Sequence, residues 1–208
     1  MHDYISLIVI FVAVAAGAMS PGPSFVYVAR HSIIHSRKNG VMTALGMGTG
    51  AFLFSIFSLM GLQAVFQAVP YAFLTLKTVG GLYLLYVAFK MFFSARKPLI
   101  NGEFTPVNSV KLKKSYVLGL ITQLSNPKTA VSLASVFSTL LPKVAPTYFY
   151  FMIPVIVFMI NAGWYTLVSL VLSAEKPRTQ YLRYKTVFDR AAGSIMGLLG
   201  MKILVSSN

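Results

Sequence analysis

Long apolar stretches separated by short polar ones constrain this chain more than any other feature. A membrane-spanning helix needs about 20 mostly apolar residues. Charged residues make up 11% of the 208 residues, whereas a soluble domain carries about 25%. We therefore predict an all-α polytopic membrane protein, with 1–208 as a single membrane domain. The six predicted spans are Tyr4–Met19 with a continuation to Ile34, Gly40–Leu62, Tyr71–Phe93, Tyr116–Leu141, Thr147–Leu172 and the shorter Ala191–Val205.

The basic residues predict how these helices are oriented. Lys and Arg number 18 and accumulate in the first, third and fifth loops, and such loops face the cytoplasm. The odd-numbered loops are therefore predicted to be cytoplasmic, with the N- and C-termini outside. The net charge of +14 then indicates a lipid bilayer as partner and no nucleic acid. Because His2 and Asp3 precede the first apolar run and no Lys or Arg does, we predict no cleaved signal peptide.

The chain divides into two halves that start from opposite sides of the membrane. The polar stretch 98–115 is predicted to be a cytoplasmic loop joining halves 1–97 and 116–208. Each half contains three spans, which makes the second half inverted, as in many secondary transporters. The first helix of each half is interrupted at a proline, at Ser20-Pro21-Gly22-Pro23 and at Ser125-Asn126-Pro127-Lys128. We therefore predict two inverted three-helix halves whose first and fourth helices are broken.

Broken helices at membrane depth predict a binding site. Irregular backbone is tolerated there only inside protein or along a cavity, and the N–H groups of a new half-helix favour an anion such as an amino-acid carboxylate. Three alternatives remain open. The first break could be an ordinary loop, and Lys128 could extend to the membrane interface or pair with a backbone carbonyl. Asn161 could form a hydrogen bond between helices instead of binding substrate. The candidate substrate-binding residues are Ser20, Pro21, Gly22, Pro23, Gln123, Asn126, Pro127, Lys128 and Asn161.

Several kinds of chemistry are disfavoured by what the sequence does not contain. There is no cysteine, and we predict no catalytic residue, no metal site and no cofactor. The four acidic residues, Asp3, Glu103, Glu175 and Asp189, are all predicted to lie outside the span cores. A basic substrate would need an anionic partner in the cavity, so a neutral amino acid is favoured. The sequence leaves open whether Asp3, a histidine or the substrate itself carries the proton.

The two interruptions resemble the hallmarks of a known transporter family. Pro21-Gly22-Pro23, Ser32, Arg37, Gly40, Gly46 and Gly50, together with Asn126-Pro127-Lys128, resemble the LysE/RhtB amino-acid exporters. The resemblance covers essentially the whole chain, although Ser36 stands where the family usually has glycine. It implies export of small amino acids across the bacterial inner membrane, driven by proton antiport.

Three other functions are weighed against this reading. An exporter of basic amino acids and a non-catalytic scaffold protein are the alternatives. A membrane-embedded enzyme is disfavoured, because no catalytic constellation is visible in the sequence. A homo-oligomer is left open.

Overall fold

The computed structural model describes residues 2–20, 22–68, 72–94, 110–142 and 145–205. This part of the chain is all-helical and holds eight helices. They are α1 (His2–Met19), α2 (Pro23–Ile34), α3 (Arg37–Ala68), α4 (Ala72–Ser94), α5 (Leu112–Leu124), α6 (Pro127–Leu140), α7 (Phe149–Leu172) and α8 (Glu175–Val205).

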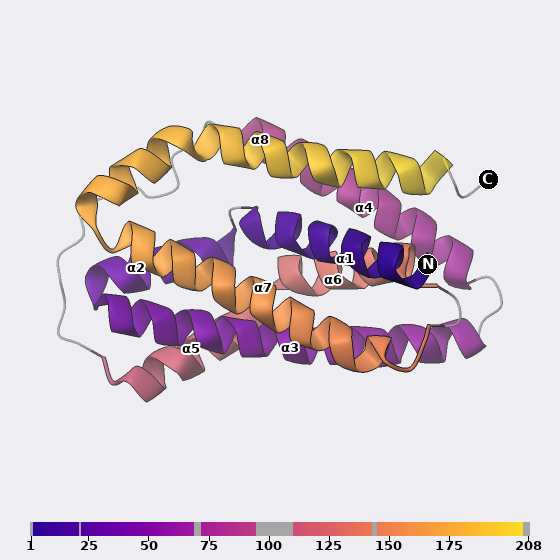
Figure 1. The fold of residues 1–208 in the computed structure, drawn as a ribbon, viewed down its shortest axis with the longest axis horizontal. Coiled ribbons are helices and arrows are strands. Elements are labelled where there is room, and N and C mark those ends of the chain that lie inside the picture. The colour runs from indigo at the N-terminus through magenta and orange to yellow at the C-terminus, as the bar shows by residue number, and fades with distance from the viewer. Residues whose placement is uncertain (1, 21, 69–71, 95–109, 143–144, 206–208) are drawn as a thin grey trace.

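Both predicted breaks are present. α1 ends at Met19 and α2 begins at Pro23, while α5 ends at Leu124 and α6 begins at Pro127. Proline suits the first position of a helix, because its missing N–H would have no partner there and its φ is already helical. Each proline thus begins a new helix, and Figure 1 places both breaks near the middle of the long axis.

The helices run roughly along the long axis of the molecule. Figure 1 shows both chain ends at the right, where α3 is followed by α4 and α6 by α7. At the left end, α2 meets α3, α5 begins, and α7 is followed by α8. α3 packs against α5 and α7, α4 packs against α6 and α8, and α1 packs against α6, α7 and α8. This arrangement surrounds the two breaks with helices from both halves of the chain.

Glycine allows α3 and α5 to cross at backbone contact. A Cβ atom added to Gly46 would overlap the backbone carbonyl oxygen of Tyr116, and one added to Gly119 would overlap that of Thr43. Both obstacles are main-chain atoms, which cannot rotate away as a side chain can. Close packing at this crossing therefore requires glycine, which has no side chain, at both positions.

The last helix differs from the sequence prediction. We expected a loop before a span at 191–205, but α8 already begins at Glu175. Pro177 lies in the first turn of α8, where proline is tolerated, and the next glycine is Gly193. Asp189 of α8 is buried, with 2% of its surface exposed, although the sequence analysis places it in a loop.

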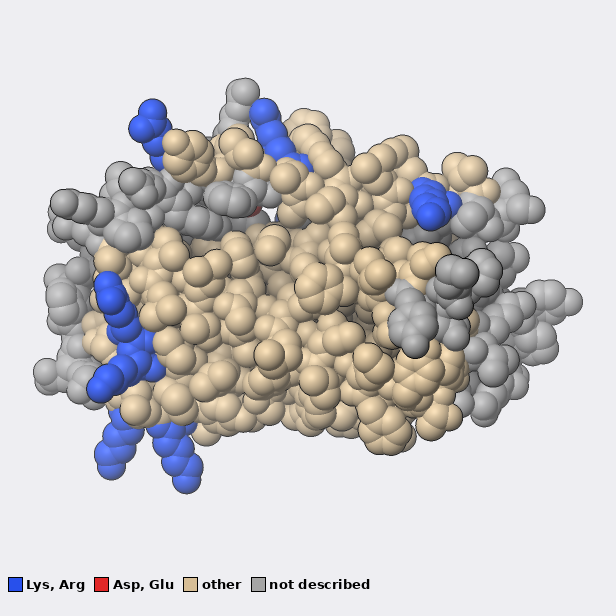
Figure 2. Space-filling model, in the orientation of Figure 1, with Lys and Arg blue, Asp and Glu red and all other residues tan. Residues whose placement is uncertain are grey.

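Two helices are long and apolar enough to cross a bilayer, judged by length and composition in the described residues. They are Arg37–Leu62 within α3 and Phe149–Leu172, which is α7. Ile5–Met19 and Pro23–Ile34 meet the same criterion as one span bent by 57°. Thr78–Lys90 in α4 forms a shorter apolar segment. Figure 2 agrees with a bilayer environment, since the middle of the face shown is almost free of charged side chains.

Candidate functional site

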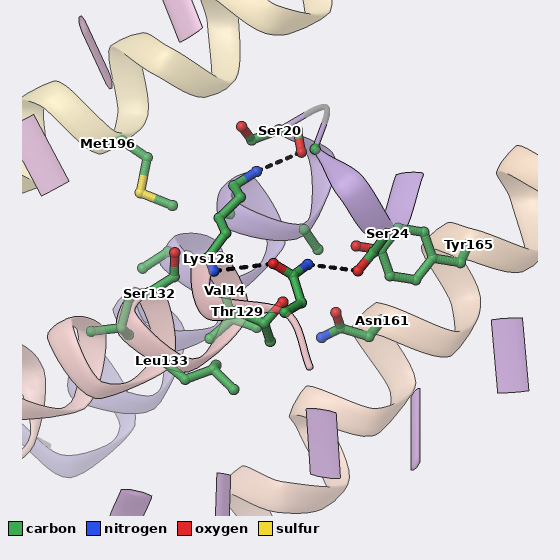
Figure 3. A pocket seen from close by; sticks show the side chains of 16 residues that line it. Val14, Ser20, Ser24, Lys128, Thr129, Ser132, Leu133, Asn161, Tyr165 and Met196 are labelled. Atoms are coloured by element: carbon green, nitrogen blue, oxygen red, sulfur yellow. Dashed lines mark hydrogen bonds between the residues drawn. The ribbon is translucent and has the colours of Figure 1, made fainter. Parts of the chain in front are cut away.

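The two helix breaks meet at Lys128. Its ammonium group donates a 2.7 Å hydrogen bond to the backbone carbonyl of Ser20, the residue after the last turn of α1. The last carbonyls of a helix lack partners within that helix and carry partial negative charge. Lys128 therefore stabilises the end of α1 although it belongs to α6 (Figure 3). The open alternative that Lys128 pairs with a backbone carbonyl is the arrangement found here.

Asn126 determines how α6 begins. It is the N-cap residue, and its side-chain oxygen accepts a 3.0 Å hydrogen bond from the backbone N–H of Lys128. Pro127 occupies the next position, where no N–H is needed. The sequence Asn-Pro-Lys thus starts a helix and places a cation in its first turn. A cation there opposes the dipole of α6, and the contact with the α1 carboxyl end offsets that cost.

A chain of buried hydrogen bonds extends from this point through three more helices. The Asn126 amide donates to the Ser24 hydroxyl at 2.7 Å, and Ser24 donates to the side-chain oxygen of Gln123 at 2.6 Å. The Gln123 amide donates to Asn161 over a long 3.4 Å, and the Asn161 amide donates to the Val157 carbonyl at 2.9 Å. These side chains belong to α2, α5 and α7, so the network joins both halves of the chain.

Lys128 lies between two cavities. The first has a volume of about 30 Å³ and is lined by Ser20, Gly22, Ser24, Asn126, Lys128 and Asn161 among others. This volume is large enough for one or two water molecules, each needing about 10–15 Å³, and too small for an amino acid. The second cavity has a volume of about 480 Å³ and is lined by the same lysine with Pro23, Pro127, Lys90 and Tyr86.

Gly22 makes room for the lysine side chain. A Cβ atom at this position would lie 3.2 Å from Cδ and 3.3 Å from Nζ of Lys128. These distances are tighter than ordinary van der Waals contact. The glycine between the two prolines therefore leaves space for the cation to approach the first break.

The structure brings most of the predicted residues together. Ser20, Gly22, Asn126, Lys128 and Asn161 line the smaller cavity. Pro23 and Pro127 are exposed to the larger one. Gln123 lines neither cavity and is fully buried as a bridge in the hydrogen-bond chain. Pro21 lies outside the described residues.

The sequence analysis missed several polar residues of this site. Ser24 is the junction of the network, and Thr129, Ser132 and Tyr165 also line the smaller cavity. Figure 3 shows Tyr165 beside Ser24, and Met196 of α8 close to Lys128. Ser24 and Thr129 could have been found, because each lies in the first turn of a helix that follows a break. Tyr165 and Met196 come from distant helices, and nothing in the local sequence indicates them.

Replacing Asn126 by alanine is expected to lower the melting temperature of the detergent-solubilised protein. The substitution removes the α6 cap, which contributes about 1 kcal/mol, and deprives the buried Ser24 hydroxyl of a donor. Asn126→Ser supplies a shorter acceptor that restores the cap without reaching Ser24, so its melting temperature should lie between those of wild type and Asn126→Ala. Equal melting temperatures for all three proteins would contradict this role.

Known proteins that resemble this chain include efflux proteins. The family model of the LysE type translocator matches residues 15–207. The "Threonine efflux protein" of Escherichia coli (strain K12) is 27% identical over 205 residues, which cover 96% of this chain and 100% of that protein. The protein of the same name from Salmonella typhi is 28% identical over 189 residues, or 90% of this chain and 92% of that protein.

A third relative covers a shorter region. The "Leucine efflux protein" of Enterobacter sp. (strain 638) is 32% identical over 119 residues, which cover 56% of this chain and 54% of that protein. No solved structure matches the chain.

Proposed function

The chain belongs to the LysE type translocator family, and we propose that it is a secondary transporter that exports small neutral amino acids. The family is one of transporters and not of enzymes, which agrees with the reading of the sequence. The relatives named for threonine efflux cover nearly the whole chain and suggest threonine as the substrate type. We include homoserine on the family resemblance described above. The bacterial relatives support placing the protein in the bacterial inner membrane.

One observation carries this proposal: a lysine ammonium lies where two broken helices meet, beside a cavity that is lined in part by polar side chains. The substrate carboxylate would take the place of the Ser20 carbonyl as the acceptor for Lys128. Such an exchange is favourable, because charge-assisted hydrogen bonds are stronger than those to neutral acceptors. The first-turn N–H groups of α2 and α6 would add their positive potential.

The proposed architecture is six spans arranged as two inverted halves, 1–97 and 116–208. Contacts between these halves come in mirrored pairs, which supports the repeat. α7 packs against α1 and α2 as α3 packs against α5 and α6. The broken helices also contact each other, through α1 with α6 and α2 with α5. A pseudo-two-fold axis in the membrane plane would produce this pattern.

The proposed orientation places the loop 98–115 in the cytoplasm and both termini outside. Exposed Lys and Arg side chains gather at the end of the molecule where α3 and α5 begin, among them Arg37, Lys38, Lys111, Lys113 and Lys114. Figure 2 shows blue side chains projecting at this left end. Such an excess marks the cytoplasmic side of a membrane protein.

A neutral substrate is favoured over a basic one by the charges around the cavities. Lys128 and Lys90 are the charged groups among the described residues that line the two cavities. A lysine or arginine side chain would meet like charge there, and like charges repel strongly where water is scarce. Asp189 is a buried carboxylate, but it lines neither cavity.

Transport requires the site to change shape. The 30 Å³ cavity is too small for an amino acid, while the 480 Å³ cavity beside it shares Ser20, Gly22, Asn126 and Lys128 in its lining. We propose that movement of one half against the other merges the two cavities on one side of the membrane and then opens the site to the other side.

The proposed function is tested with the purified protein in lipid vesicles under an imposed pH gradient. Labelled threonine, homoserine, leucine, lysine and arginine are offered in turn, with protein-free vesicles as the control. We expect gradient-dependent transport of threonine or homoserine and little transport of lysine and arginine. Faster transport of lysine or arginine than of any neutral amino acid would show a basic-amino-acid exporter. No transport of any amino acid would favour the scaffold alternative.

A further inference from the structure

Asp189 is a buried acidic residue that the site described so far does not use. It lies in α8 and is 2% exposed, and it is the only acidic residue whose side chain the structure describes. Burying a carboxylate is costly unless a nearby charge compensates for it. A charge so placed within a transport protein is a functional candidate by default.

Asp189 lies on the face of α8 that reaches the cavity at Lys128 through Met196. Residues seven apart lie on one face of a helix, and Met196, seven positions later, lines that cavity. Ala192 and Met196 on the same face are buried, while Arg190 and Ile195 are exposed. The inward face of α8 therefore carries a buried carboxylate about two helical turns from the residue that lines the cavity.

The charges of Asp189 and Lys128 interact. The ammonium of Lys128 lies within electrostatic range of the Asp189 carboxylate and of the Lys90 ammonium. A zwitterionic amino acid carries one negative and one positive group. Lys128 of α6 offers a positive charge for the substrate carboxylate, and Asp189 of α8 offers a negative charge for its ammonium group.

We propose that Asp189 binds the α-ammonium group of the substrate and, when the substrate has left, binds the proton that drives export. This inference rests on the proposed function and extends it to the coupling ion. The substrate ammonium and the proton are both cations that compete for one carboxylate, so the site holds one or the other. Substrate leaves on one side of the membrane, a proton then binds to the carboxylate, and the proton is released on the other side before the next substrate binds.

The same carboxylate limits which substrates fit. It compensates one ammonium group, and no acidic side chain lines either described cavity to compensate the additional cation of lysine or arginine. Selection for neutral amino acids then follows from one lysine and one aspartate.

Any test must distinguish the titration of Asp189 from that of other titratable groups in the protein. α8 packs against α4, α1 and α7. α4 contributes Lys90, Tyr83 and Tyr86, while α7 contributes tyrosines and the described side chains of α1, from Ile5 onward, contribute no titratable group. The sequence leaves a histidine open as the proton carrier, and His31 and His35 of α2 contact each other with ring centroids 4.4 Å apart. The histidines are therefore the alternative proton carriers.

The test measures the threonine dissociation constant of the purified full-length protein between about pH 5 and pH 7. In wild type, competition with one proton should weaken threonine binding by up to about tenfold for each unit by which the pH is lowered. Asp189→Asn is expected to bind threonine more weakly and with no such pH dependence. In vesicles it should lose transport driven by the pH gradient while keeping threonine–threonine exchange.

The control variant is Arg190→Gln, which changes the charge of the neighbouring residue. Arg190 is exposed and lines a separate cavity with Phe89, Phe92 and Phe93, so this variant should keep the wild-type pH dependence. Asp189→Glu retains a titratable carboxylate and should keep a pH dependence even if Asp189→Asn fails to fold.

Three results would overturn the inference. The first is wild-type pH dependence in a folded Asp189→Asn protein. The second is pH-independent binding by folded Asp189→Glu. The third is loss of the pH dependence in His31→Asn with its retention in Asp189→Asn. The proposed function is judged separately, because it fails if wild type neither binds nor exchanges any neutral amino acid, and the inference then falls with it.

Discussion

Replacing Lys128 by methionine is expected to reduce threonine transport by about 30-fold or more, because loss of one partner of a buried charge pair costs about 2–5 kcal/mol and 1.4 kcal/mol corresponds to tenfold. Methionine keeps most of the aliphatic length, so the effect reports the missing ammonium. The measurement is the initial rate of threonine uptake into vesicles over a range of threonine concentrations. The loss should appear chiefly as weaker binding.

A lysine outside the site provides the matched control. Lys202 is exposed near the end of α8, and Lys202→Met removes one positive charge without touching either cavity. Its transport rate should equal that of wild type. Equal rates for Lys128→Met and wild type, with both proteins folded and correctly inserted, would remove Lys128 from the binding site.

Replacing Gly46 or Gly119 by alanine is expected to destabilise the protein strongly. Alanine normally stabilises a helix by about 1 kcal/mol relative to glycine. At these two positions the added methyl group would overlap the carbonyl oxygens of Tyr116 and Thr43, and overpacking costs about 1–3 kcal/mol. The backbones of α3 and α5 would have to separate. The measurement is the melting temperature in detergent, which should fall in both variants.

Gly61 is the control glycine for this experiment. It lies in α3, and a Cβ atom added there would meet nothing within 4 Å. Gly61→Ala should therefore keep or raise the melting temperature. If Gly46→Ala and Gly119→Ala were as stable as Gly61→Ala, the close crossing of α3 and α5 would be wrong.

Much of the fold was predictable because the strongest local signals are also the ones that set the helix boundaries. Pro23 and Pro127 each begin a helix where the sequence predicts an interruption. Most of the candidate residues near these prolines line one cavity, because the two helix breaks meet in the fold and bring their flanking residues together. Asn126 illustrates this, since a residue that can cap a helix stood immediately before a proline.

The remaining features depend on packing between distant segments. Ser24 acquires its role from hydrogen bonds to residues 99 and 102 positions away. Asp189 was placed in a loop because its surroundings are rich in charge, and charge density suggests exposure. Its burial results from α8 beginning at Glu175 and turning one face inward. No local pattern in the sequence indicates which face that is.

The most direct measurement of the central claim is an experimental structure of the protein with threonine bound. The account predicts that the threonine carboxylate lies within hydrogen-bonding distance of Lys128 Nζ, between the ends of α1 and α6, in a cavity enlarged from the present one. A structure in which threonine binds elsewhere, with Lys128 still on the Ser20 carbonyl, would contradict it.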